Sequence, residues 1–377
     1  MVKARPDTET RQPSAVSLKA LDWANFFLAD VRDGLGPYLS IYLLTAQHWN
    51  AQSIGLAMSV MGIATVIAQT PAGALVDRTR HKRLYSILAS LLIAAASLLT
   101  ILLPTFGVII GGQAVMGVAA AWFVPAIAAI TLGLVGHRQL DGRIGRNETF
   151  NHAGNVFAAL VAGLIGYYVG NEGIFVLLAV MSILSSATIW RIQEKDIDHA
   201  LARGSTEQAK GPVGWKAVLT NRIILLFAIA CVLFHFANAA MLPLLGQRLA
   251  QGHAASVSSV YMSACIVVAQ VVMVPVSSWA GRLAPHGRKR LLLIGFAVLP
   301  VRGLLYTLTN NPDILIAIQV LDGVGAGIFG VMSVLVVADL TQGSGLFNTT
   351  QGAIATATGL GASLSNAFAG IIVQRAG

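Results

Sequence analysis

Charged residues are scarce in this sequence. Only 11% of the 377 residues are Asp, Glu, Lys or Arg, whereas soluble globular proteins carry roughly a quarter. This scarcity excludes an ordinary soluble enzyme, and the 55% of hydrophobic residues indicates a polytopic membrane protein. Cysteine is also rare: Cys231 and Cys265 both lie in apolar runs and show no metal-binding spacing, so we expect two buried thiols.

Several motifs that would indicate cofactor chemistry are missing. The sequence contains neither the phosphate-binding pattern GxxxxGK[ST] nor the zinc pattern HExxH. We therefore predict no ATP coupling, no metal site and no cofactor. Residues 1–18 lack an apolar core, so they are not a signal peptide, and we predict a short cytoplasmic tail.

Long apolar stretches fill the rest of the chain. A bilayer-spanning helix needs about 20 residues, and polar or Gly/Pro-containing turns separate eleven such stretches. We place the spans at residues 19–46, 53–76, 84–104, 107–135, 147–170, 173–190, 221–246, 256–280, 291–309, 313–338 and 346–373. The longest polar interval is a predicted cytoplasmic loop, 191–220. It divides the chain into an N-terminal six-helix bundle, 19–190, and a C-terminal bundle of five spans, 221–377.

The basic residues are distributed unevenly along the chain. The net charge of +9 could indicate a nucleic-acid partner, but this would require basic residues clustered with aromatic ones on a polar surface. Instead, with the N-terminus inside, 21 of the 25 Lys and Arg residues fall in loops on the cytoplasmic side, and only Arg248 and Arg375 fall in outer loops. This bias predicts the orientation of the protein and argues against nucleic-acid binding.

The two halves of the chain contain matching segments. Gly73 and the basic loop after it recur at Gly281. Gln113-x-x-x-Gly117 recurs at residues 319–323, and the segment 26–30 matches the segment 234–238. The three matches occur in the same order, at offsets of 206 to 208 residues. They indicate duplicated six-helix halves.

The loop after the second span resembles the signature G-x-L-x-D-R-x-G-R-[KR] of the major facilitator superfamily of secondary transporters. It contains Gly73, Leu75, Asp77, Arg78 and Lys82. The resemblance implies an all-α fold of two six-helix repeats with twelve spans, so a twelfth span is expected beyond the eleven visible here. It also implies that the loop acts as a gate, formed by Gly73, Asp77, Arg78, Lys82 and Arg83. Asp77 could meet the positive end of the eleventh helix near residues 345–348, and the basic side chains could also contact lipid head groups.

Ionisable residues within the first span are candidates for the transport site. Charges inside a membrane are costly and usually face a cavity or a partner. Asp30 and Asp33 share one helix face, with Arg32 between them in the sequence. A carboxylate there could bind a proton or a cation. The alternative is that Arg32 neutralises one aspartate as a structural pair.

The fifth span has a wide polar face. Glu148 and His152 are four residues apart, and Asn151 and Asn155 lie on the neighbouring stripe. His152 could titrate near neutral pH. These residues are candidates for proton coupling or the substrate cavity, and the alternative is polar packing against a neighbouring helix.

Other polar residues extend the set of candidates. In the seventh span, His235 and Asn238 share a face, and Asn238 is the repeat counterpart of Asp30. Arg302 and Asp322 lie at similar depths in consecutive antiparallel spans, so we predict a buried structural pair, with Asp322 also a cavity candidate. Weaker cavity candidates are the amides Gln113, Gln270 and Gln319.

Together these features predict a monomeric secondary transporter of the inner membrane, with a cytoplasmic N-terminus. It would move a small organic solute by alternating access, coupled to protons, and the frequencies within the resembled family favour efflux slightly. Uptake of a metabolite or metal chelate, by symport or facilitated diffusion, is the alternative. A membrane sensor or enzyme is a third possibility, which the repeat and the absence of a soluble catalytic domain disfavour.

Overall fold

A computed structural model describes residues 12–33, 38–39, 42–43, 46–49, 51–205, 218, 220–250 and 255–376. The described part is almost entirely helical, as the composition predicts. In chain order the helices are α1 (Ala15–Asp33), α3 (Ala51–Arg78), α4 (Lys82–Leu102), α5 (Phe106–Tyr168), α6 (Glu172–Arg191), α8 (Arg222–Asn238), α9 (Met241–Ala250), α10 (Ala255–Leu283), α11 (Arg288–Thr307), α12 (Pro312–Thr341) and α13 (Phe347–Ala376). Three short 3-10 turns are η1 (Glu194–Asp196), η2 (Leu201–Arg203) and η3 (Ala284–His286).

Helix boundaries follow from local chemistry. The side chain of Asn221 accepts hydrogen bonds from the first free amides of α8, and that of Asn311 does the same for α12, where Pro312 occupies the first helical position. The predicted spans 107–135 and 147–170 correspond to two helices within the range of α5, which meet at a kink at Gly136. Its φ of 66° is readily adopted only by glycine.

The predicted seventh span, 221–246, is divided. Helix α8 ends at Asn238, and α9 begins at Met241. Ser365 of α13 accepts a hydrogen bond from the free amide of Ala240 at this break. Among the described residues, eight helices are long and apolar enough to cross a membrane, so the number of eleven spans stays a prediction.

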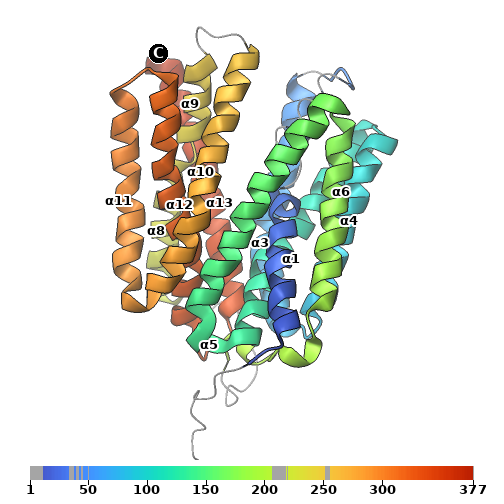
Figure 1. Ribbon diagram of the computed structural model, residues 1–377, viewed down its shortest axis with the longest axis vertical. Coiled ribbons are helices and arrows are strands. Elements are labelled where there is room, and N and C mark those ends of the chain that lie inside the picture. Colours follow the sequence, from blue (N-terminus) through green and yellow to red (C-terminus); the bar gives the residue numbers. More distant parts are fainter. Residues whose placement is uncertain are drawn as a thin grey trace, which may run out of the picture.

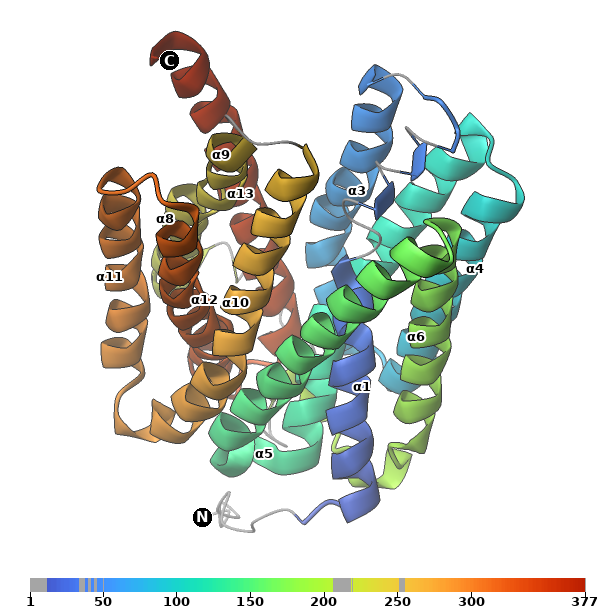
Figure 2. The same ribbon diagram turned by 45° about the horizontal axis from the view of Figure 1, so that its top comes forward.

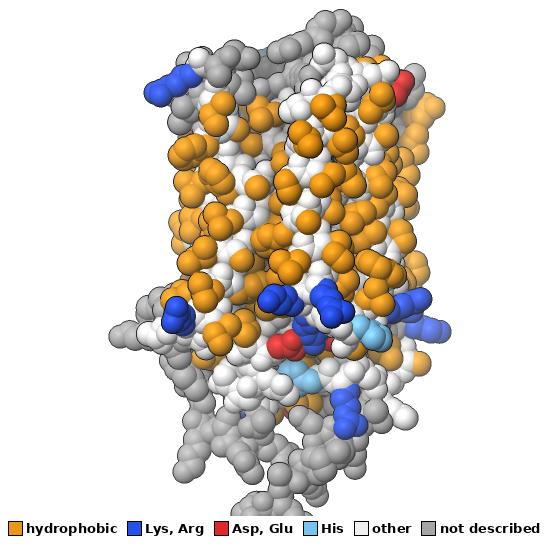
Figure 3. All heavy atoms as spheres, turned by 90° about the vertical axis from the view of Figure 1, so that its left-hand side faces the viewer, with side chains coloured by type: hydrophobic (Ala, Val, Ile, Leu, Met, Phe, Trp, Pro, Cys, Tyr) orange, Lys and Arg blue, Asp and Glu red, His pale blue; other side chains and the backbone are white. Residues whose placement is uncertain are grey.

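The helices form two groups that meet at one end. Helices α1 to α6 lie on one side and α8 to α13 on the other, and the groups converge near the N-terminus of α1 and diverge toward the opposite end (Figures 1 and 2). Figure 3 shows an apolar belt on one face, with Lys and Arg side chains gathered below it. We call this the basic end. The division into an N-terminal and a C-terminal bundle at 191–220 stays a prediction about folding units, and residues 206–217 lie outside the described part.

Two helix crossings join the groups at the basic end, and both are built on glycine. Where α5 crosses α10, a Cβ atom at Gly145 would lie 2.8 Å from the Ser277 carbonyl oxygen, and one at Gly281 would lie 2.7 Å from that of Asp141. Only glycine allows two helix backbones to approach so closely.

The crossing of α3 with α13 repeats this arrangement. A Cβ atom at Gly73 would lie 2.1 Å from the carbonyl oxygen of Asn348, and one at Gly352 would lie 2.2 Å from that of Gln69. Gly73 and Gly281 are repeat counterparts at an offset of 208 residues, and Gly145 and Gly352 match at 207. The internal repeat of the sequence therefore appears in space as two equivalent crossings.

A strap of residues 192–205 follows α6 and runs across the basic end. Asp196 Oδ2 accepts hydrogen bonds from the hydroxyls of Ser14 (2.6 Å) and Ser17 (2.7 Å) at the start of α1. Further along, the Ala202 carbonyl accepts a hydrogen bond from the Asn348 side chain, and that of Gly204 accepts one from the Gly345 amide. The strap thus connects α1 to the beginning of α13.

Candidate functional site

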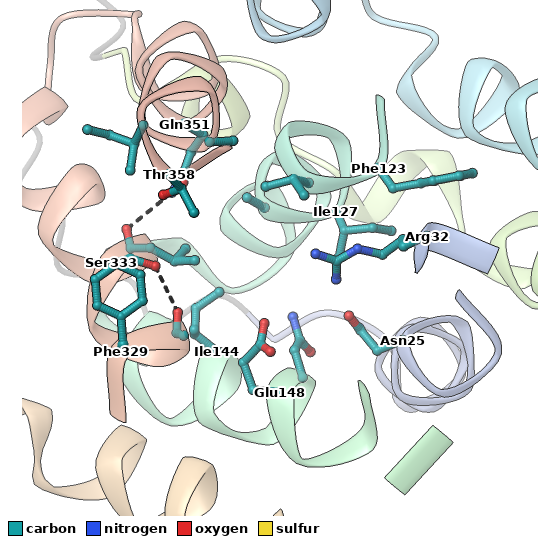
Figure 4. Close-up of a pocket in the computed structure, with 17 residues that line it drawn as sticks. Asn25, Arg32, Phe123, Ile127, Ile144, Glu148, Phe329, Ser333, Gln351 and Thr358 are labelled. Carbon is teal, nitrogen blue, oxygen red and sulfur yellow. Dashed lines mark hydrogen bonds between the residues drawn. The ribbon is translucent and has the colours of Figure 1, made fainter. Parts of the chain in front are cut away.

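A cavity of about 210 Å³ lies between the two helix groups. Its walls come from both groups, α1 and α5 on one side and α12 and α13 on the other. Figure 4 shows Arg32 and Glu148 extending into this space from different helices, with the aromatic ring of Phe329 at its other side. The polar residues that line it are Asn25, Arg32, Asn147, Glu148, Ser333, Gln351 and Thr358.

A second cavity, of about 630 Å³, is formed chiefly by α3 and α13, with Arg32 of α1 and Gln113 of α5 also in its wall. Much of its wall is apolar, from side chains such as Met58, Met61 and Leu360, while Gln69 and Gln113 add amide groups. Among the described residues, Arg32 is the one that lines both cavities. We call the two spaces the first and the second cavity.

An acid–base cluster extends from the first cavity toward α10. The Nε2 atom of His152 lies 3.9 Å from Glu148 Oε2, and Nδ1 lies 2.9 Å from Gln270 Oε1. Because an amide oxygen only accepts hydrogen bonds, Nδ1 is the donor to Gln270, while Nε2 faces Glu148 and has no hydrogen-bond partner among the described residues. Asn151 donates a hydrogen bond to the same carboxylate oxygen, at 3.3 Å. Four predicted residues, two of them titratable, are therefore brought together, and the cluster connects α5 with α10.

A second ionic network lies beside the first cavity, and sequence reasoning missed it. Asp22 is 3% exposed and accepts hydrogen bonds from Arg143 (2.6 Å) and, through two nitrogen atoms, from Arg146 (2.7 and 2.9 Å). Arg143 also donates to Asn147, whose side chain donates to Thr131. From the sequence, Arg143 and Arg146 were predicted only to be basic residues of a cytoplasmic loop. The signal available was a lone aspartate near the start of the first span, at the depth of these arginines.

The predicted pair of Arg302 and Asp322 is found as an ion pair within the C-terminal group. Arg302 is 1% exposed and also donates a 3.0 Å hydrogen bond to Asn238, at the break between α8 and α9. His235 lies nearby on α8 but interacts with the Cys231 carbonyl and the ring of Phe329. Gln319 donates to the hydroxyl of Tyr306.

Asp77, from the signature loop, contacts the first turn of α13. Its two carboxylate oxygens accept hydrogen bonds from the backbone and side chain of both Asn348 and Thr349, at 2.6 to 3.2 Å. A carboxylate is stabilised by the positive end of a helix. Lys82 donates to the Thr79 carbonyl within the loop (2.6 Å), and Arg83 pairs with Glu194 of the strap (3.0 Å), whereas Arg78 is exposed.

The remaining candidates are less closely associated with the cavities. Asp30 is partly buried on α1 and lines neither of the two cavities described here. The side chain of Asp33 lies outside the described residues. Asn155 lies on α5, one turn beyond the acid–base cluster. Gln113 lines the second cavity, with a weak hydrogen bond to the sulfur of Met116 at 3.8 Å.

Comparison with known proteins identifies the family. Residues 21–366 match the sequence model described as Major Facilitator Superfamily. The chain belongs to this superfamily. Two proteins of Mycobacterium tuberculosis, named uncharacterized MFS-type transporters MT2531 (strain CDC 1551 / Oshkosh) and Rv2456c (strain ATCC 25618 / H37Rv), are each 51% identical over 365 residues, covering 95% of this chain and 87% of theirs. The predicted family is confirmed.

Solved structures of the major facilitator superfamily share the fold. The transporter FucP in the outward conformation matches with a TM-score of 0.72 at 14% identity, over 96% of this chain and 93% of that one. The proton:xylose symporter XylE matches with a TM-score of 0.70 at 11% identity, over 96% and 88%. This chain is therefore a multi-pass membrane transporter of the superfamily, not an enzyme.

Proposed function

We propose that this protein moves a small organic solute across the inner membrane by alternating access, coupled to protons, with its N-terminus in the cytoplasm. The observation that carries the proposal is the acid–base cluster of Glu148, His152 and Gln270. It combines two titratable groups at the edge of a cavity with a hydrogen bond from one helix group to the other.

The cluster has the geometry for a proton to alter the contact between the halves. With Glu148 ionised, a protonated His152 can pair with it and still donate to Gln270. Alternatively, His152 is neutral and Glu148 itself binds the transported proton, so that its carboxyl group is uncharged before the cavity closes. A buried carboxylate without a proton or partner is costly in a membrane, so the closure of the cavity would depend on the protonation of this residue. Asp30 and Asp33 remain second candidates for the same task.

The closed crossings at the basic end support an arrangement in which that end is sealed while the opposite end is accessible. The contacts of Asp77 with α13 would hold the seal, and their release would open the basic end. The signature loop and the glycine crossings would then act as the gate on the cytoplasmic side.

Efflux is the preferred direction, on the frequencies within the family. Uptake by symport is a second candidate, favoured by the names of two structural neighbours, a fucose:proton and a proton:xylose symporter. The direction of the solute flux in sealed vesicles separates the two candidates.

The test uses purified full-length protein in proteoliposomes under an imposed pH gradient, with a panel of radiolabelled organic solutes. Solute accumulation driven by the gradient is expected for the unaltered protein. Accumulation should be lost in Glu148→Gln, while counterflow, which needs no gradient, continues. Glu172→Gln is the matched control, because Glu172 is exposed at the opposite end of the bundle. Equal accumulation in Glu148→Gln and the control would contradict the role of the cluster, and Asp30→Asn would then identify the alternative carboxylate.

A further inference from the structure

Arg32 differs from the other arginines of the interior. Arg143 and Arg146 pair with Asp22, and Arg302 pairs with Asp322. Arg32 is partly buried and lines both cavities, yet within the described part of the chain it forms no ion pair and no hydrogen bond.

A cation in a membrane helix is unfavourable without water or an anionic partner, and the described residues supply no such partner for Arg32. Charged groups in membrane helices are usually paired or face a binding pathway. Figure 4 shows the guanidinium group directed into the first cavity, away from α1. Among the described residues, Glu148 is the one carboxylate that lines the first cavity, and the acid–base cluster already engages it; none of the described residues that line the second cavity is a carboxylate.

The second cavity adds a further group without a partner. The Oε1 atom of Gln69 is buried and accepts no hydrogen bond in the described part. A buried amide oxygen without a donor is unfavourable, so a guest that supplies an N–H or O–H group would be favoured there. Arg32 on α1, Gln69 on α3 and Gln113 on α5 thus present one cationic and two amide groups from three helices.

The rest of this cavity is suited to an apolar body. Met58, Met61, Val66 and Leu360 form much of the wall, and methionine side chains adapt to guests of different shape. A volume of about 630 Å³ is within the range of pockets that hold small organic ligands.

We propose that an amphipathic organic anion binds with its carboxylate on Arg32, at the boundary of the two cavities, and extends into the second cavity, with a hydrogen-bond donor on Gln69 and its apolar part against the methionines. The inference rests on the proposed function, for which it specifies the class of solute. A guanidinium group can donate two parallel hydrogen bonds to a carboxylate, whereas a lysine in its place supplies only a point charge.

The first experiment measures binding without assuming transport. Purified full-length protein in nanodiscs is titrated with hexanoate, benzoate and phenylacetate, and with the neutral amides of the same three acids. The carboxylates should raise the melting temperature, and the amides should do so less. In Arg32→Gln the affinity for the carboxylates should fall about 10- to 100-fold, with no change for the amides. Arg32→Lys should retain part of the affinity, and Arg290→Gln, which removes an exposed arginine, should retain all of it.

A second measurement locates the anion. Arginine modification by phenylglyoxal is followed by peptide mass spectrometry, with and without each carboxylate. Protection confined to Arg32 by the carboxylates supports the site, while equal labelling of Arg32 with and without them overturns it. A panel in which no carboxylate binds more tightly than its amide also overturns the proposal, as does a fully folded Arg32→Gln protein that binds carboxylates unchanged.

The two proposals fail in different ways. Proton-driven accumulation of a neutral solute that persists in Arg32→Gln would refute the anion site and leave proton-coupled transport standing. Carboxylate binding lost in Arg32→Gln, together with no gradient-driven flux of any solute in the unaltered protein, would refute proton coupling and leave the anion site standing.

Discussion

Replacing Gly281 with alanine tests whether the backbone contact between α5 and α10 holds the basic end closed. The new Cβ would lie 2.7 Å from the Asp141 carbonyl oxygen and 2.8 Å from the Gly145 Cα. Carbon atoms pack at about 3.5–4.0 Å, so α10 and α5 must separate by roughly 1 Å there. Overpacking of this kind costs about 1–3 kcal/mol, because the atoms that would have to move belong to the backbone.

This cost falls on the state in which the crossing is closed. If the protein alternates between two states, the equilibrium should shift about 5- to 150-fold toward the state with an open basic end. We would measure the shift by double electron–electron resonance between spin labels at Gln139 and Arg282, both exposed beside the crossing. Cys231 and Cys265 are replaced beforehand so that only the introduced cysteines are labelled.

Gly163→Ala is the matched control. Gly163 also lies within α5, but a Cβ there would meet no atom within 4 Å, so the substitution should only favour the helix, by up to about 1 kcal/mol. A distance distribution in Gly281→Ala that equals those of the control and the unaltered protein would refute the assignment of this crossing as the gate.

Three further predictions concern individual ion pairs and hydrogen bonds. Asp77→Asn places an amide donor against the donors of Thr349, so the closed state should lose about 1–3 kcal/mol, measured as a longer distance between labels on α3 and α13. Arg302→Ala should lower thermal stability sharply, because it leaves the carboxylate of Asp322 buried without its partner, and the double variant with Asp322→Ala should recover part of the loss; strictly additive losses would contradict the pairing. Burial opposes the ionisation of Asp196, but hydrogen bonds from Ser14 and Ser17 outweigh this and hold its pKa below the usual value. Its stabilising effect is therefore present above the unfolded-state pKa and is lost as the pH falls through the folded-state value, so protease cleavage within the strap should accelerate in acid, and Asp196→Asn should remove that dependence.

Much of the architecture could be predicted from the sequence because membrane spans and repeats leave strong patterns. The order of the helices follows the apolar stretches, and the counterpart segments around Gly73 and Gly281 identified the duplication that the glycine crossings display in space. Gly145 and Gly352 were missed, although they match at the same offset. A glycine within an apolar helix usually indicates close packing somewhere, but the sequence does not tell which backbone approaches it.

The candidate site was predicted less completely. The helical spacing of Glu148 and His152 showed that they share a face, but the contact with Gln270 depends on how α10 packs against α5. Asp22 and the arginines on α5 are more than 120 positions apart in the sequence, and no local pattern connects them. In the first span, Asp30 and Asp33 were the predicted transport residues. Of the described residues, however, Arg32 is the one that lines both cavities.

The glycine crossings have a consequence for how such a protein can diversify. The seal at the basic end consists largely of main-chain atoms in contact, whereas the two cavities are bounded by side chains. Substitutions of side chains that reshape a cavity would therefore leave the glycine crossings intact, and the solute specificity could change without changes at the crossings. Under the proposed function, selection for a new solute would act mainly on the cavity side chains and selection for the motion mainly on the glycines of the crossings, so the cargo could change while the gate is retained.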